Sequence, residues 1–332
     1  MTPQRKRSRL PWIAAVLLVL SGAVVLGLIT SGELDRASGG ESTAASSGRG
    51  RGLPGPRPQT MTPAADDEFA RYGRARASEH VGVRFKKAPR AGLLFNVKTG
   101  EVLWSLHPRR KRSIASLTKM MTAILTVREL DPDAQVHITK EVLNYRGSGV
   151  GVFKRGKRFQ LETVLYGLLL PSGNDAAIAL AQRVSGTVAR FVNLMNAEAR
   201  RLGLRCTRFT GPDGYDKGNR SCPRDLAVLA RVVLRQPRLA RIVRTRSAVR
   251  KGPVKGRRVY LYNHNPLQRL RFKGVTGVKT GFTDEAGRCF VGTARRGGVH
   301  LGVVLLNSPD TGGQARTLLT KGFRAMGVSK SS

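Results

Sequence analysis

Cysteine is scarce in this sequence, with three residues among 332. Three cysteines are too few for a disulfide scaffold, and their spacing lacks the paired pattern of a zinc site, so we expect no metal. In an oxidising compartment Cys206 and Cys222 could form one bridge, which would leave Cys289 as a buried thiol. Only geometry decides whether the pair is bridged.

Acidic residues are also few, since 21 Asp and Glu stand against 59 Lys and Arg, and the formal charge is +38. Residues 68–332 carry 51 of the basic and 16 of the acidic residues, so the charge belongs to the folded part. Such an excess attracts polyanions, whether nucleic acid, phospholipid or anionic wall polymer. Basic runs such as 109–112 lack the interleaved aromatics that stack on bases, which argues against nucleic acid.

The N-terminus contains an uncharged segment, residues 10–32, that follows four basic residues within positions 1–9. This pattern predicts a helix inserted with residues 1–9 in the cytoplasm and the rest of the chain outside. Its length favours an uncleaved anchor, while Ser21 and Ala23 would suit a signal peptidase, so both alternatives stay open. Residues 33–67 are rich in Gly, Ser and Pro and predict a flexible linker before a catalytic domain at 68–332.

The folded part begins and ends with strand patterns and is helical between them. Alternation on both sides of a Gly-containing turn predicts a hairpin over 90–106. Apolar residues at helical spacing follow the hairpin and predict helices, and later alternating runs predict strands. The predicted helices span 116–130, 161–170, 175–184, 191–202, 223–234 and 314–326, and the later strands 275–279, 288–294 and 299–306. We expect an α+β fold, with an antiparallel sheet built from both ends of the domain, helices covering it and a helical subdomain.

Ser116 and Lys119 lie one helical turn apart. A hydroxyl becomes a good nucleophile when a base takes its proton, and a lysine can be that base where its surroundings keep it neutral. The spacing alone is weak evidence, because an N-capping serine followed by a solvated lysine has the same pattern. Farther along, Ser172 and Asn174 follow a helix-stopping proline, and residues 279–282 offer an ammonium, a hydroxyl and backbone N–H groups at a strand.

Three segments together resemble the motif set of the low-molecular-mass penicillin-binding proteins, the D-alanyl-D-alanine carboxypeptidases. They occur in the family's order, with Gly173 where the second motif often has Asp. The likeness spans roughly residues 90–322. It implies the β-lactamase/transpeptidase-like fold, an extracytoplasmic location and no cofactor. The three segments are Ala115–Ala123, Leu170–Ala177 and Gly277–Thr283.

The resemblance also implies roles for particular residues. Ser116 would attack the D-Ala-D-Ala end of a peptidoglycan stem peptide after Lys119 removes its proton, and β-lactams would acylate it. Ser172 would protonate the leaving D-Ala, while Asn174 would orient Lys119. The charge of Lys279 should help to keep Lys119 neutral. Substrate binding is expected from Lys279, Thr280, Gly281 and Phe282, with the backbone N–H groups of Ser116 and Phe282 holding the oxyanion.

Alternatives remain at this point. A class A β-lactamase would need a glutamate after the second motif, and we expect Glu198, beside Arg200 and Arg201, to form a surface ion pair instead. A D,D-endopeptidase would use the same catalytic residues. A non-enzymatic polyanion binder would explain the charge alone. The second Lys-Thr-Gly copy, at 98–100, falls at the hairpin turn and is expected to be structural.

Overall fold

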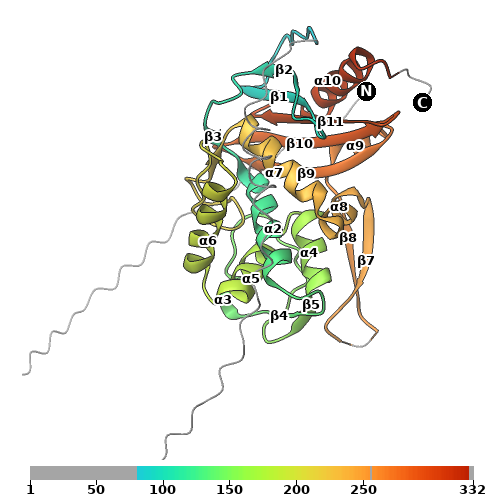
Figure 1. The fold of residues 1–332 in the computed structure, drawn as a ribbon. Helices are drawn as coiled ribbons and strands as arrows, with labels where there is room; N and C mark the ends of the chain where they lie inside the picture. Colours follow the sequence, from blue (N-terminus) through green and yellow to red (C-terminus); the bar gives the residue numbers. More distant parts are fainter. Residues whose placement is uncertain (1–80, 255, 329–332) are drawn as a thin grey trace, which may run out of the picture. The chain divides into compact units, whose positions relative to one another are not determined.

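The structure is a computed structural model that describes residues 81–254 and 256–328 (Figure 1). The expected cytoplasmic segment 1–9, the anchor or signal peptide 10–32 and the linker 33–67 lie outside these residues. In the part that the structure describes, no helix combines the length and the hydropathy needed to cross a bilayer. Membrane attachment therefore rests on the sequence of the N-terminus alone.

The centre of the described part is a five-stranded antiparallel sheet with the strand order β2-β1-β11-β10-β9. Strand β1 pairs with β11 along its whole length, from Ala91 opposite Leu306 to Asn96 opposite Leu301. In Figure 1 the cyan N-terminal strands therefore lie beside the orange and red C-terminal ones. The prediction of one sheet built from both ends is confirmed. The strands are β1 (Ala91–Asn96), β2 (Val102–Leu106), β9 (Val275–Thr283), β10 (Gly287–Arg296) and β11 (Val299–Leu306).

The hairpin that opens the domain turns at 96–100, as predicted. Oδ1 of Asn96 accepts hydrogen bonds from the backbone N–H groups of Lys98 and Thr99, at 2.9 and 3.3 Å. Gly100 has a φ of 80°, which a residue with a side chain rarely adopts. The Lys-Thr-Gly copy at 98–100 is thus a turn, and its role is structural.

Helices cover both faces of the sheet and bury separate apolar clusters (Figure 1). Helix α10 (Thr311–Ala325) packs against β11 and β10 and buries Leu318, Leu319 and Phe323. On the other face, α7 (Pro223–Arg235) contacts β1 and β11, and α2 (Lys119–Glu129) packs against α7. This larger cluster extends into the helical part. Helix α2, and with it the first motif, therefore lies on the face of the sheet opposite α10.

The helical part contains the elements that the sequence predicts, together with shorter ones that it does not. The predicted helices appear as α4 (Leu161–Leu169), α5 (Asn174–Ser185) and α6 (Val188–Arg201). Among the described residues, three two-stranded antiparallel ribbons pair segments outside the main sheet. Helix α8 directly precedes the last of these ribbons. The unpredicted elements are α3 (Lys140–Leu143), α8 (Pro237–Arg244), α9 (Pro266–Arg269), β3 (Arg112–Ser113) with β6 (Arg220–Ser221), β4 (Gln135–His137) with β5 (Arg158–Gln160), and β7 (Ser247–Lys251) with β8 (Arg258–Tyr262).

Glu198 forms an ion pair, as expected, but the expectation that it lies on the surface is wrong. The Glu198 side chain is only 3% exposed, and its carboxylate contacts Arg128 at 2.6 Å and Arg201 at 2.7 Å. The ion pair exists, but it lies between α2 and α6 rather than on the surface. Both arginines lower the pKa of Glu198, and burial opposes them. The carboxylate is therefore committed to holding two helices together.

Candidate active site

Ser116 lies in a single 3₁₀ turn, Ala115–Thr118, directly before α2. The turn starts with Ala115 at a φ of 47°, and the Thr118 hydroxyl donates to the Ala115 carbonyl at 2.8 Å. Leu117 and Ile114 are fully buried and fix this turn in the core. Ser116 itself is half-buried and lines a cleft, so its hydroxyl can meet a ligand.

Lys119 occupies the first turn of α2 and is completely buried. Its Nζ atom lies 2.8 Å from Oγ of Ser116, 2.6 Å from Oδ1 of Asn174 and 2.7 Å from the carbonyl oxygen of Asp213. These three contacts use the full hydrogen-bonding capacity of an ammonium group. The predicted pairing of Ser116 with Lys119 is therefore present at hydrogen-bond distance.

The surroundings of Lys119 lower its pKa towards neutral pH. Burial lowers the pKa to about 8, and the carboxylates of Asp213 and Asp175 oppose this effect. Burial, rather than the charge of Lys279, is thus the main cause of the lowered pKa. The pKa of Lys279 is lowered well below its usual value, mainly by burial and additionally by the charge of Lys119. A lysine with a pKa near 8 can take up a proton from a neighbouring hydroxyl.

The second motif forms the link between α4 and α5. Ser172 has a φ of 70°, in the left-handed region, and its Oγ is buried without a hydrogen-bond partner among the described residues. Asn174 begins α5; its Nδ2 donates to the Arg146 carbonyl, and its backbone N–H donates to the Ser148 carbonyl at 2.7 Å. These bonds aim Oδ1 of Asn174 at Lys119. A buried hydroxyl without a partner costs about 1–3 kcal/mol, which suggests a ligand-binding role for Ser172.

The third motif lies on the edge strand β9, against the Ser116 turn. A Cβ atom at Gly281 would lie 3.0 Å from both the Ser116 backbone nitrogen and the Ile114 carbonyl oxygen. Only glycine allows this close approach of the two backbones. Lys279 is 2% exposed, and its Nζ donates to the Thr280 carbonyl at 3.0 Å. Phe282, in contrast, is 63% exposed at the mouth of the cleft.

The cleft has a volume of about 570 Å³. Ser116, Asn174 and Phe282 line it directly, while Lys119, Ser172 and Lys279 are buried. The structure therefore joins the first motif to the second through Lys119 and to the third through Gly281. The other lining residues are Arg146, Gly147, Ser148, Gly214, Tyr215, Asp216, Lys217, Thr283, Asp284 and Glu285.

One segment that contacts the site, the loop 211–214, is not among the site residues expected from the sequence. The Asp213 carbonyl accepts from Lys119, and the Pro212 carbonyl accepts from the Thr122 hydroxyl. Gly214 has a φ of 82°, and a Cβ there would overlap the Ala115 carbonyl. The Gly-Pro-Asp-Gly sequence marks a turn, but nothing in it indicates that the turn would close over Lys119.

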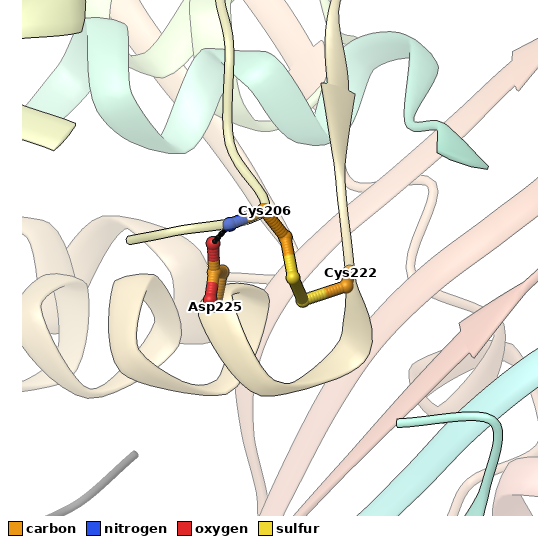
Figure 2. Close-up of side chains that lie close together, drawn as sticks. All are labelled: Cys206, Cys222 and Asp225. Carbon is orange, nitrogen blue, oxygen red and sulfur yellow. Dashed lines mark hydrogen bonds between the residues drawn. A yellow bond between two sulfur atoms is a disulfide. The ribbon is translucent and has the colours of Figure 1, made fainter. Parts of the chain in front are cut away.

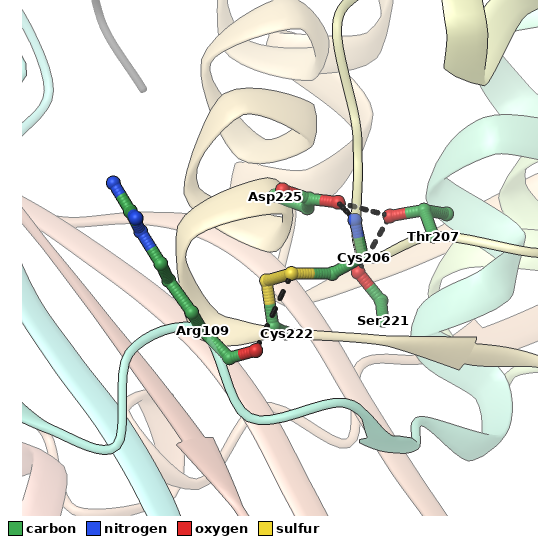
Figure 3. Close-up of a disulfide and its surroundings, with 6 residues drawn as sticks. All are labelled: Arg109, Cys206, Thr207, Ser221, Cys222 and Asp225. Carbon is green, nitrogen blue, oxygen red and sulfur yellow. Dashed lines mark hydrogen bonds between the residues drawn. A yellow bond between two sulfur atoms is a disulfide. The ribbon is translucent and has the colours of Figure 1, made fainter. Parts of the chain in front are cut away.

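A disulfide between Cys206 and Cys222 encloses this loop. Figure 3 shows the bridge beside Asp225, whose carboxylate accepts from the Cys206 N–H and the Thr207 hydroxyl, both at 2.7 Å. Ser221 and Thr207 also share a hydrogen bond of 2.8 Å. Of the two alternatives that the sequence left open, the bridged pair is the one present. Cys289 is a buried free thiol, as expected, and burial raises its pKa to about 11.

Cys206, Cys222 and Asp225 also form a cluster of metal-ligating residue types (Figure 2). Both sulfur atoms are used in the disulfide, and metal ions bind thiolates rather than disulfides. The carboxylate of Asp225 already accepts two hydrogen bonds. The chemistry of this donor set therefore does not suit a metal ion while the bridge is intact.

Comparisons with known proteins agree with this arrangement. The sequence profile of the D-alanyl-D-alanine carboxypeptidases matches residues 81–310. D-alanyl-D-alanine carboxypeptidase DacF of Bacillus subtilis is 30% identical over 73% of this chain, which spans 61% of that relative's length. The corresponding enzyme DacB2 of Mycobacterium tuberculosis is 34% identical over 70% of this chain and 81% of its own. The solved structure of the Streptomyces K15 DD-transpeptidase, 31% identical, superposes with a TM-score of 0.69 over 73% of this chain and all of that chain. This chain belongs to the D-alanyl-D-alanine carboxypeptidase family.

Proposed function

We propose that this protein is a serine-type D-Ala-D-Ala carboxypeptidase that removes the terminal D-Ala from peptidoglycan stem peptides. The observation that carries the proposal is the 2.8 Å contact between Lys119 Nζ and Ser116 Oγ at the cleft. Burial lowers the pKa of Lys119 to about 8, so that roughly one tenth of the molecules hold a neutral amine there at pH 7. This fraction is enough to supply a general base.

Acylation would begin when Lys119 takes the hydroxyl proton of Ser116 and the oxygen attacks the carbonyl carbon of the penultimate D-Ala. The backbone N–H groups of Ser116 and Phe282 would hold the negative oxygen that forms. The C–N bond then breaks, and the leaving D-Ala amine receives a proton through the Ser172 hydroxyl, which Lys119 resupplies. Water would hydrolyse the acyl-enzyme, release the shortened peptide and restore Ser116.

Lys279 and Thr280 would bind the carboxylate at the end of the substrate. Burial and the nearby Lys119 lower the pKa of Lys279 in the free protein. An incoming carboxylate would reverse this effect, because an opposite charge favours the ammonium form. The free energy that burial costs Lys279 would then be recovered only with an anionic ligand, which favours peptides with a free C-terminus over internal bonds.

A β-lactam resembles the D-Ala-D-Ala dipeptide, and we propose that it acylates Ser116 and stays bound. Fast turnover would need a second base for deacylation. Glu198 does not suit this role, since its carboxylate is paired with Arg128 and Arg201. Endopeptidase action on cross-links would use the same residues and is a separate outcome of the test below.

We further propose that the enzyme acts at the outer face of the cytoplasmic membrane, held there by residues 10–32, or is secreted if these residues are cleaved. The uncharged run after four basic residues supports this location. The disulfide between Cys206 and Cys222 also fits an oxidising compartment.

The test uses the full chain in a non-ionic detergent, with a muramyl pentapeptide and a cross-linked muropeptide dimer as substrates. We expect release of free D-Ala from the pentapeptide, little cleavage of the dimer, and a covalent penicillin adduct by intact-protein mass spectrometry. Ser116→Ala should abolish both release and adduct without unfolding the protein. An adduct on Ser116→Ala, or unchanged D-Ala release by it, would contradict the proposal, and rapid hydrolysis of a chromogenic cephalosporin would favour a β-lactamase.

A further inference from the structure

A basic hollow of about 580 Å³ lies at the end of the sheet where β2 and β11 stop. Lys87, Arg90 and Arg110 contribute exposed cationic side chains to it, and His107 contributes an exposed imidazole. Its other lining residues are uncharged, so no carboxylate among them offsets these cations. Hollow surfaces of one charge concentrate the field and attract the opposite charge.

A second hollow, of about 470 Å³, lies between α9 and the start of α10. Arg269, Arg288 and Arg316 line it and are exposed. The carboxylate in this hollow belongs to Asp310, which caps α10 by accepting from the Gly313 N–H at 2.9 Å. The helix N-terminus therefore neutralises part of that negative charge, and the hollow stays basic.

The two hollows adjoin each other. Pro309 lines both of them, and the segment 307–310 runs from the first hollow to the second. Arg288 donates to the Pro309 carbonyl at 3.0 Å, which places its guanidinium beside this shared wall. We call the combined surface the basic groove. It presents six lysine and arginine side chains against one carboxylate.

We infer that the basic groove binds a linear polymer with regularly spaced phosphate groups, such as a phosphodiester polymer of the cell wall. Arginine forms bidentate hydrogen bonds with phosphate oxygens, and five of the six cations are arginines. Two adjoining hollows suit an extended chain that crosses both. A flat bilayer would instead need a protruding surface with apolar and aromatic side chains, and Leu270 is the one large apolar side chain exposed in the second hollow.

Strand β10 and the turn before it connect the groove to the catalytic cleft. Asp284 and Glu285, in the turn between β9 and β10, line the cleft, and Arg288 on β10 lines the groove three residues later. A polymer held in the groove would keep the enzyme on the wall that contains its peptide substrate. This function is separate from catalysis, so a small peptide substrate should not depend on it.

The test measures binding of fluorescently labelled linear polyphosphate to the full chain in non-ionic detergent by anisotropy. The groove variant carries Arg90→Gln, Arg110→Gln, Arg269→Gln and Arg316→Gln. The matched control carries Lys154→Gln, Arg155→Gln, Lys157→Gln and Arg158→Gln, which remove the same charge from exposed positions in and before β5, far from the sheet (Figure 1). A third variant replaces the four groove arginines by lysine, to keep the charge.

We expect the groove variant to bind at least about tenfold more weakly and the control to lose less than about threefold. A plot of log K against log salt concentration should be less steep by about 3 in the groove variant. Each phosphate contact releases about 0.7 counterions when it forms, and the variant loses four such contacts. The lysine variant should lose less affinity than the glutamine variant, because it keeps the charge and loses only the bidentate geometry of arginine. All variants should release D-Ala from a pentapeptide at the wild-type rate.

Equal losses in the groove variant and the control would overturn the inference, because binding would then follow net charge alone. Displacement of the labelled polyphosphate by unlabelled competitors is the second test of the inference. Unlabelled polyphosphate should displace the probe better than free phosphate at the same phosphate concentration. Displacement of equal strength by micelles that contain phosphatidylglycerol would identify a membrane-docking surface instead, and tighter binding of oligothymidylate would identify a nucleic-acid site.

Discussion

The Nζ atom of Lys119 and the Oδ1 atom of Asn174 lie 2.6 Å apart, and this contact joins the first turn of α2 to the first residue of α5. Asn174 is itself held by bonds to the carbonyls of Arg146 and Ser148. The amide oxygen is neutral, so it orients the amine without fixing a positive charge on it as a carboxylate would. Together with burial, this choice of partner allows Lys119 to exist as a free amine.

The pH dependence of acylation follows from this environment. Only the neutral form of Lys119 can accept the Ser116 proton, and its pKa is lowered to about 8. The second-order rate constant for acylation by penicillin should therefore rise about tenfold per pH unit below this value and level off above it. Stopped-flow measurements from pH 5.5 to 9.5 would check this. A rate that stays constant between pH 6 and 9 would exclude Lys119 as the base.

Asn174→Asp should move the same profile to higher pH. A carboxylate at 2.6 Å from Nζ stabilises the ammonium form, and such a neighbour raises a lysine pKa by about one unit or more. Acylation at pH 7 should then fall by about tenfold or more, while the plateau at high pH is partly recovered. Asn193→Asp, on the exposed side of α6, is the matched control and should leave the midpoint in place. An unshifted midpoint in Asn174→Asp would mean that the contact does not set the basicity.

Gly281→Ala should slow catalysis and also lower the stability of the protein. The new methyl group would lie 3.0 Å from the Ser116 nitrogen, so the Ser116 turn and β9 must separate by a few tenths of an ångström. We expect kcat to fall by about ten- to a hundredfold, since small displacements of reacting groups cost that much, and the free energy of unfolding to change by about 1–2 kcal/mol. Gly82→Ala serves as the control, because no atom lies within 4 Å of its Cβ position. Wild-type kcat in Gly281→Ala would show that the close approach is dispensable.

Loss of the disulfide should destabilise the protein and its active-site loop together. The bridge spans 16 positions, and closing a loop of this size contributes about 3 kcal/mol to the free energy of unfolding. The double variant Cys206→Ser with Cys222→Ser should unfold at lower urea and lose kcat, because the Asp213 carbonyl that contacts Lys119 lies in the enclosed loop. Cys289→Ala keeps the bridge and is the control. If reduced and oxidised wild type unfold at the same urea concentration, the bridge has no such role.

Much of the fold could be predicted from residue patterns. The 90–106 hairpin, the helix after Ser116 and the three closing strands follow from alternation and helical spacing, and the structure contains all of them. The ribbon strands β3 to β6 were missed because each has two or three residues, too few for a periodic pattern. Helix α8 was missed because it has only eight residues, although Leu239, Ile242 and Val243 follow the i, i+3, i+4 spacing of a helix.

The sequence by itself determined which groups take part in the candidate site, because the three motifs contain the hydroxyl, amine and amide groups in a fixed order. Tertiary structure alone decided their environment. The lowered pKa of Lys119 comes from its burial, with the 211–214 loop in contact with its amine. The approach of Gly281 to Ser116 comes from the packing of β9 on the turn, and the burial of Glu198 comes from the contact of α2 with α6. Each of these depends on residues far apart in the chain, and the pKa of a side chain depends on how much water surrounds it, which no local spacing specifies.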